Sequence, residues 1–224
     1  MPPTIILVRH AQALHNVDRD YTIHDPPLSE LGRAQCLDLK SNLVPKIPSQ
    51  LDVELIIVSP MKRTIETALI AFPELINRGV PIVAHAGWQE NSSQCCDIGS
   101  SLNDLPAEFP QVDFSQVDRT FPLKFRNEYA YSRPAILARG QSVLKDLYER
   151  KEKAIIVVSH SGFLRAGVTG RWFFNADYRV FNFDGGPTKL KESDMTKGKG
   201  GLGWSFEEET ELGDGLPDVE ENTT

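Results

Sequence analysis

Cysteine is scarce in this chain of 224 residues. There are only three, Cys36, Cys95 and Cys96, and no two of them have the C-x-x-C spacing of a zinc ribbon. An odd number with two adjacent members also argues against a disulfide framework of the kind found in small secreted domains. We therefore expect a protein of a reducing compartment, and predict a cytoplasmic location.

Long hydrophobic runs are also missing. The longest apolar run near the start covers only residues 5–8. A membrane-spanning helix needs roughly 20 apolar residues, and the core of a signal peptide needs roughly 7 to 15. The sequence therefore predicts no membrane partner.

Positive charge is in short supply, since 24 Lys and Arg residues face 31 Asp and Glu residues. Nucleic-acid-binding proteins need a basic face, so we predict no nucleic-acid partner. The negative excess is concentrated in eight carboxylates after Phe206. Without them there are 24 basic and 23 acidic residues, so the body of the chain is nearly neutral. Its charge therefore does not exclude an anionic substrate.

Short apolar runs supply the first structural signal. They are continuous rather than alternating, and each is followed by polar residues, which is typical of strands buried on both faces of a parallel sheet. The strong runs cover residues 4–8, 55–58 and 154–158, and weaker candidates cover residues 80–84 and 179–183.

Helical periodicity lies between these runs. Apolar residues repeat at helical spacing within residues 32–43, 65–72 and 136–148. Ser29 is predicted to cap the first of these helices, and Ser59 followed by Pro60 the second. Alternating strands and helices predict an α/β fold, with helices on both faces of a mostly parallel central sheet in three layers.

Two segments lack such patterns. Residues 87–133 are rich in Gly, Pro, Ser and aromatic residues, and we predict a loop-rich insertion over the functional site that sets specificity. Residues 185–224 are predicted to be a Gly- and Lys-rich linker followed by a solvated acidic tail. The catalytic domain is then expected to span residues 1–184.

Charged and imidazole side chains follow each of the three strong strands. Arg9 and His10 follow the first, Arg63 lies in the helical turn after the second, and His160 follows the third. Ligands of an open parallel sheet bind beyond the carboxyl ends of its strands, so these four side chains should converge. Guanidinium groups, imidazoles and helix N-termini around one point are suited to a phosphate group.

Two histidines in such a site favour distinct roles. One, if neutral, can attack phosphorus as a nucleophile, while the other, if protonated, can stabilise charge on the phosphoryl oxygens. Glu90 is the candidate general acid for the leaving oxygen. A metal site is disfavoured because neighbouring arginines repel a cation and the ligand spacing is absent, so we expect no cofactor.

The segment Val8-Arg9-His10-Ala11 resembles the RHG motif of the histidine phosphatase superfamily, also called phosphoglycerate mutase-like. Supporting segments follow in the family's order, and the resemblance covers about residues 4–183. Ala11 and Ser161 stand where the family often has glycine, and Ala13 stands where it often has Ser or Thr. The supporting segments are residues 25–35, 59–68 and 159–165.

The resemblance implies a role for each matching residue. His10 would form a phosphohistidine, while Arg9, Arg63 and His160 would hold the phosphoryl group and Glu90 would donate the proton. Asn16 would be a further contact of the phosphate pocket. Ser161 and Thr22 are the remaining candidates for substrate binding, because they lie beside these motifs in the chain.

The segment after Glu90 bears on the reaction. Mutases of the superfamily carry basic residues there for a second phosphate, whereas this chain has no Arg or Lys between Arg78 and Arg119. Cys96-Asp97 instead resembles the fungal and plant phosphatases of the family. We predict hydrolysis of a small phosphate monoester; a cofactor-dependent mutase, which would need a bisphosphate primer, and a non-catalytic phospho-ligand binder are the alternatives.

Overall fold

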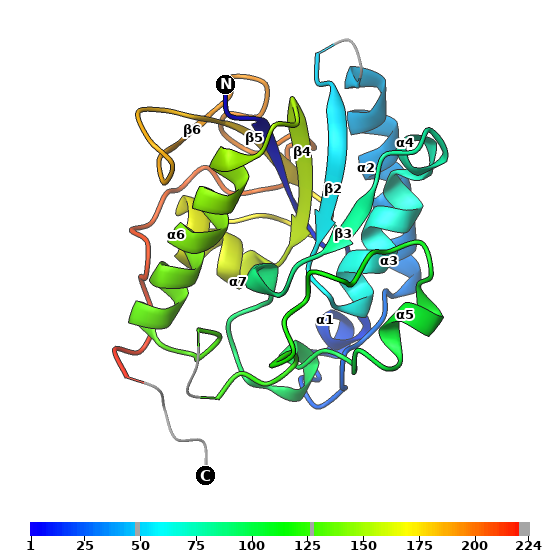
Figure 1. Ribbon diagram of the computed structural model, residues 1–224, viewed down its shortest axis with the longest axis vertical. Helices are drawn as coiled ribbons and strands as arrows, with labels where there is room; N and C mark the ends of the chain where they lie inside the picture. Colours follow the sequence, from blue (N-terminus) through cyan, green and yellow to red (C-terminus); the bar gives the residue numbers. More distant parts are fainter. Residues whose placement is uncertain (48–49, 126–127, 220–224) are drawn as a thin grey trace.

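A six-stranded mixed sheet forms the centre of the molecule (Figure 1). The computed structural model describes residues 1–47, 50–125 and 128–219, so Glu220 and Glu221 of the predicted acidic tail lie outside the described residues. The strand order is β3-β2-β4-β1-β5-β6. The strands are β1 (Thr4–Arg9), β2 (Val53–Val58), β3 (Ile82–Ala84), β4 (Ala154–Ser159), β5 (Tyr178–Phe183) and β6 (Leu190–Glu192).

The first four strands are parallel and β5 and β6 are antiparallel to their neighbours, which confirms the predicted mostly parallel sheet. All six residues of β4 are buried, as are the four central residues of β1. Both faces of these strands are covered, which is why their apolar runs are continuous in the sequence.

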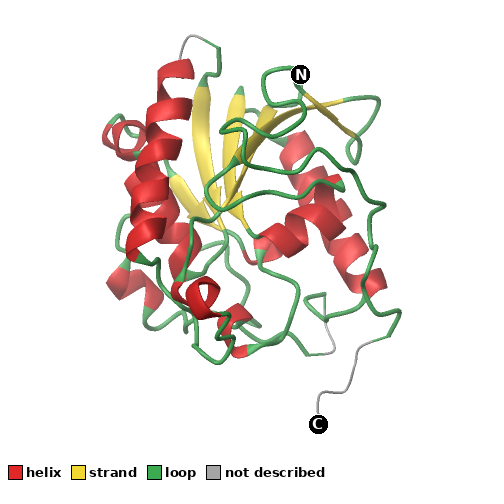
Figure 2. Cartoon of the chain, turned by 180° about the vertical axis from the view of Figure 1, so that it is seen from behind, coloured by secondary structure: helices red, strands yellow, loops and turns green. Residues whose placement is uncertain are grey.

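Helices cover both faces of the sheet (Figures 1 and 2). Ile6 and Val8 of β1 pack in one core cluster with the helices that follow β1 and β2. Ile5 and Leu7 point the other way, into a second cluster with the long helix before β4. The helices are α1 (Leu14–Asp18), α2 (Glu30–Leu43), α3 (Lys62–Ala71), α4 (Pro73–Asn77), α5 (Leu105–Glu108), α6 (Arg133–Glu149) and α7 (Ser161–Phe163).

Short 3₁₀ turns and one π-helical turn complete the secondary structure. The π-helical turn continues α7 directly. None of the helices in the described part of the chain is long and apolar enough to cross a membrane. The 3₁₀ turns cover Val44–Lys46, Ala86–Trp88 and Cys95–Asp97, and the π-helical turn covers Leu164–Thr169.

One of the two predicted helix caps is confirmed. The side chain of Ser29 accepts a hydrogen bond from the backbone N–H of Gly32 at 3.0 Å. The prediction for Ser59 is wrong, because α3 begins at Lys62 with Met61 as its N-cap. The hydroxyl of Ser59 instead forms a hydrogen bond with the imidazole ring of His160.

The C-terminal segment differs from the prediction of a linker and a solvated tail. Residues 190–192 form the edge strand β6, and the segment then folds back along the body of the protein. Thr196 and Ser205 are buried, and Thr210 pairs with Gly170 through a backbone hydrogen bond. The signal was obscured because glycines and charged residues mark both linkers and the turns of an irregular packed segment.

Asp177 anchors this segment. Its carboxylate is fully buried and accepts backbone hydrogen bonds from Leu202 at 2.8 Å, Trp204 at 3.3 Å and Ser205 at 3.0 Å, and another from the hydroxyl of Ser205 at 2.6 Å. The backbone carbonyl of Asp177 also accepts from the N–H of Arg9. One side chain therefore ties the C-terminal segment to the end of β1.

We expect Asp177→Asn to lower the free energy of unfolding by about 3 kcal/mol, because an amide places an N–H₂ donor against donors that a carboxylate satisfies. Urea unfolding followed by circular dichroism measures the change. Asp184→Asn is the control, since Asp184 is exposed, and it should alter stability by less than about 0.5 kcal/mol. Equal stability of the two variants would contradict this role for Asp177.

Candidate active site

The structure brings the four predicted side chains together at the carboxyl ends of three neighbouring strands. Arg9 is the last residue of β1 and His10 follows it, Arg63 lies in the first turn of α3 after β2, and His160 follows β4. The imidazole rings of His10 and His160 lie 5.1 Å apart, centroid to centroid. We call these four residues the cage.

His10 is held by backbone groups. Its Nδ1 lies 2.7 Å from the carbonyl oxygen of Ala11, and because a carbonyl only accepts, Nδ1 carries the proton and Nε2 bears a lone pair. The carbonyl of His10 accepts hydrogen bonds from the side chain of Asn175 and the N–H of Ala176. Burial, reinforced by the positive charges of Arg63 and Arg9, lowers the pKa of His10 well below 6.5. The imidazole is therefore neutral, as a nucleophile must be.

His160 is fully buried and its Nε2 lies 2.9 Å from the hydroxyl oxygen of Ser59. Burial first, and then the charge of Arg63, lowers its pKa well below 6.5. The expectation that the second histidine is protonated therefore differs from the structure, in which the groups of the protein favour a neutral ring. Its Nδ1 has no hydrogen-bond partner among the described residues. A phosphate dianion against that ring would oppose the effect of Arg63.

Arg63 is anchored from outside the cage. One guanidinium nitrogen donates to the carbonyl of Cys96 at 2.6 Å and another to the carboxylate of Asp97 at 2.9 Å. The second oxygen of Asp97 accepts from the hydroxyl of Ser92 at 2.6 Å. The Cys-Asp pair is recognisable in the sequence, but the contact of Asp97 with Arg63 is not. The signal for it is an acidic residue a few positions after Glu90.

Arg9 is anchored from the other side. Its guanidinium donates to the carbonyl of Phe173 at 2.9 Å, and its Cζ lies 5.7 Å from the ring centroid of Trp172. Burial lowers the pKa of Arg9 to about 10, so the group stays charged at neutral pH. Its orientation therefore depends on residues 172–173, which the sequence analysis did not single out.

Glu90 lies against the start of α7, next to the cage. One carboxylate oxygen accepts from the N–H of Phe163 at 2.8 Å and from Asn91 at 2.9 Å, and the other accepts from Gly162 at 3.0 Å. Because α7 follows His160 directly, these bonds fix the carboxylate relative to that histidine. A Cβ atom at Gly162 would lie 2.5 Å from the Glu90 carboxylate, so glycine is required for this approach.

Two buried basic side chains, which the sequence did not predict, contact residues 90–92. Lys124 donates to the carbonyls of Glu90 at 2.8 Å and Ser92 at 2.9 Å, and burial lowers its pKa to about 7. Arg139 of α6 donates to the side-chain oxygen of Asn91 at 3.0 Å. Lys124 lies in a segment without periodicity, so nothing marked it, whereas a charged residue within the apolar stripe of α6 was a usable signal for Arg139.

The three further candidates have more local contacts. Asn16 accepts from the N–H of Ala13 at 3.1 Å and contacts the ring of His15 at 2.9 Å, so it holds the start of α1. The hydroxyl of Ser161 donates weakly to the carbonyl of Phe173 at 3.4 Å. Thr22 is exposed, and its hydroxyl donates to Asp20. The structure thus places Asn16 in α1 against His15, Ser161 directly after His160 and Thr22 in a surface turn.

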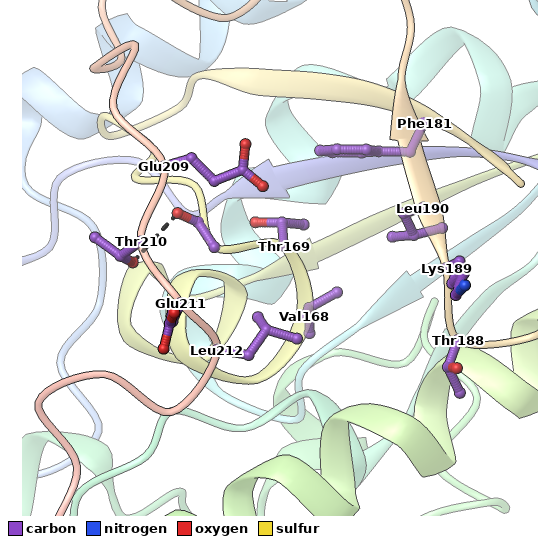
Figure 3. Close-up of a pocket in the computed structure, with 11 residues that line it drawn as sticks. Val168, Thr169, Phe181, Thr188, Lys189, Leu190, Glu209, Thr210, Glu211 and Leu212 are labelled. Atoms are coloured by element: carbon purple, nitrogen blue, oxygen red, sulfur yellow. Dashed lines mark hydrogen bonds between the residues drawn. The ribbon is translucent and has the colours of Figure 1, made fainter.

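A separate pocket of about 660 Å³ lies between the π-helical turn, the β5–β6 hairpin and the C-terminal segment (Figure 3). Thr210 and Gly170 both line this pocket, and the hydroxyl of Thr210 donates to the backbone carbonyl of Gly170. Its wall includes Val168, Phe181 and Leu190, but none of the residues of the cage. Among the described residues, no three His, Cys, Asp or Glu side chains are grouped to hold a metal ion.

The family comparison agrees with this geometry. The sequence model of the histidine phosphatase superfamily (branch 1) matches residues 5–202. The chain belongs to this superfamily. The match begins in β1 and extends past β6 into the C-terminal segment.

Relatives of this superfamily member include fungal and plant proteins. A Schizosaccharomyces pombe protein named as a probable phosphatase is 34% identical over 166 residues, which cover 70% of this chain and 73% of the relative. An Arabidopsis thaliana phosphoglycerate mutase-like protein is 34% identical over 196 residues, with 72% of each chain covered.

Solved structures of the same fold cover most of the chain at low identity. A putative α-ribazole-5′-phosphate phosphatase of Escherichia coli superposes with a TM-score of 0.56 at 16% identity and covers 85% of this chain and 97% of its own. A mycobacterial glucosyl-3-phosphoglycerate phosphatase gives 0.53 at 16% identity, with 85% and 97% covered. These likenesses confirm the predicted fold.

We expect stability to fall as the pH drops from 7.5 to 5. Burial lowers the pKa of His10 and His160 well below 6.5 and that of His15 to about 4. Below pH 6.5 the unfolded chain therefore binds protons that the folded chain does not, and stability is complete only above that value. Each of these histidines should lower the free energy of unfolding at pH 5 by about 2 kcal/mol relative to its value at pH 7.5.

Urea unfolding at each pH measures this slope. The variant His160→Asn keeps a polar group beside Ser59 but removes one titrating ring, and should be less sensitive to pH by about 2 kcal/mol over this range. A wild-type stability that is the same at pH 7.5 and pH 5 would contradict the assignment of neutral buried rings.

We expect Gly162→Ala to lower kcat by about 10- to 100-fold while the protein stays folded, because the added methyl group displaces the Glu90 carboxylate. Steady-state kinetics in the wild type and in a Glu90→Gln background measure the effect. If the methyl group acts through Glu90, the same substitution changes kcat little in the second background. Additive losses would show that Gly162 acts elsewhere.

Proposed function

We propose that this member of the histidine phosphatase superfamily hydrolyses a small-molecule phosphate monoester through a phosphohistidine at His10. The observation that carries the proposal is the hydrogen bond from Nδ1 of His10 to the carbonyl of Ala11, which leaves the lone pair of Nε2 available beside two guanidinium groups. A neutral nitrogen nucleophile held against fixed positive charge is what attack on a phosphate ester needs.

In the first step Nε2 of His10 forms a bond to phosphorus while the bond from phosphorus to the ester oxygen breaks. Arg9, Arg63 and His160 hold the phosphoryl oxygens, and Glu90 gives its proton to the leaving alkoxide to release the alcohol. In the second step Glu90 takes a proton from water, whose oxygen attacks phosphorus. The bond between phosphorus and nitrogen then breaks, which releases inorganic phosphate and restores neutral His10.

Transfer to water, rather than to a second site of the substrate, is supported by the surroundings of Glu90. Its two neighbouring cations, Lys124 and Arg139, are buried and donate inward to backbone carbonyls and to Asn91. Such groups are poorly placed to hold a second phosphate. The fission yeast relative is named as a probable phosphatase, and a fold relative from Entamoeba histolytica is named as a phosphoserine phosphatase.

The nucleophile is tested by His10→Ala, which should lower kcat at least about a thousandfold. His24→Ala is the matched control, because His24 is exposed and lies outside the cage. Rapid acid-free quenching with a ³²P-labelled monoester should trap a base-stable, acid-labile label on the wild type but not on His10→Ala. With an aryl ester such as 4-nitrophenyl phosphate, whose leaving group needs no proton, Glu90→Gln should accumulate that label, because the water step still loses its base.

Three results would contradict the proposed function, and each points to a different alternative. Full turnover by His10→Ala would show that the nucleophile is wrong. Activity that requires a bisphosphate primer and returns label to the product would identify a mutase. Tight binding of phosphate without turnover or label would identify a non-catalytic binder.

A further inference from the structure

Four aromatic side chains form one connected cluster. The rings of Trp172 and Phe206 are stacked with centroids 4.3 Å apart, and Phe174 meets Trp172 and Trp204 edge to face at 5.9 Å each. We call this cluster the aromatic wall. It joins the loop before β5 to the C-terminal segment, whose packing the sequence did not predict.

The wall is open to solvent. Phe174 is 37% exposed, Trp204 40% and Phe206 55%. Aromatic residues that only anchor a segment bury their rings, whereas a contiguous exposed apolar surface on a monomer marks a binding region. Anchoring of this segment is instead provided by the buried Asp177 and Ser205.

The wall begins at the cage. The guanidinium carbon of Arg9 lies 5.7 Å from the centroid of Trp172, and the same guanidinium donates to the carbonyl of Phe173. Asn175 and Ala176, the next residues along the chain, both donate to the carbonyl of His10. The aromatic wall therefore starts next to Arg9 of the cage.

Exposed apolar residues also lie near His10 on and after α1. The ring of His15 lies 6.1 Å from that of His10 and 6.4 Å from that of Tyr21, centroid to centroid. Tyr21 is 45% exposed, and Leu14 and Val17 on α1 are also exposed. Exposed apolar side chains thus lie near both His10 and Arg9.

We propose that the aromatic wall binds a flat aromatic group carried by the alcohol part of the phosphate monoester. This inference rests on the proposed function, which supplies the phosphate end of the substrate. A planar ring stacks on Phe174 and Trp204 in the way aromatic pairs do in protein interiors. The exposed carboxylates of Glu207 and Glu208 follow Phe206 directly, and they disfavour alcohols that carry a negative charge.

The test uses two esters that share the reacting group. Ethyl phosphate and 2-phenylethyl phosphate both release a primary alcohol, so their intrinsic reactivities are similar and they differ in the ring. For the wild type we expect kcat/KM to be roughly tenfold higher for the phenylethyl ester, with most of the difference in KM.

Variants of the aromatic wall then test whether it causes the preference for the phenylethyl ester. Phe174→Ala and Trp204→Ala should each bring the ratio of kcat/KM for the two esters to within about twofold of one. Trp204→Leu keeps apolar volume without a ring, and should do the same if the alanine variant is unstable. Tyr148→Ala removes an exposed aromatic residue of α6 outside the wall and should leave the ratio at its wild-type value.

The outcomes distinguish failure of this inference from failure of the proposed function. Equal kcat/KM values for the two esters in the wild type would overturn the inference and leave the proposed function intact. Equal losses on both esters in the wall variants, with a lower melting temperature, would show that the wall only supports the C-terminal segment. Absence of turnover and of phosphohistidine with either ester would overturn the proposed function, and this inference with it.

Discussion

Two guanidinium groups fixed side by side at one edge of the sheet, one fully buried and one half-buried, are the constraint on which the rest of the site depends. Arg9 and Arg63 are placed by the ends of β1 and β2, and neither is free to turn to solvent. A buried charge is costly unless hydrogen bonds satisfy it, and here carbonyl oxygens and one carboxylate do so. Burial, reinforced by the charge of Arg63, lowers the pKa of both His10 and His160 and keeps the two rings neutral.

Charges of alternating sign surround this pair. Asp97 faces Arg63, while the charge of Glu90 is felt by Arg9, Lys124 and Arg139. The loop-rich segment of residues 87–133 supplies three of these charged groups: Glu90, the carboxylate of Asp97 that pairs with Arg63, and Lys124, which donates to the backbone carbonyl of Glu90. A network of this kind is fully satisfied only when all of its members are in place.

The sequence predicted much of the sheet and the cage, because both follow from signals that are local in the chain. Continuous apolar runs give buried strands, and polar residues directly after them give the site at the strand ends. Asp97, Lys124 and Trp172 were missed because their roles come from contacts across the fold rather than from spacing. Ser59 has the sequence pattern of a helix cap, yet its hydroxyl forms a hydrogen bond with His160, which lies 101 residues away in the chain.

The position of β1 has a consequence for how the protein is made. This first strand pairs on one side with β4, Thr4 opposite Ala154, and on the other with β5, Val8 opposite Tyr178. Pairings so distant in sequence form late and slowly, because a long loop must close before they contribute. On the ribosome Arg9 and His10 lack these neighbouring strands until β4 and β5 have left the exit tunnel. A nascent chain that ends before β4 and β5 therefore cannot assemble the cage.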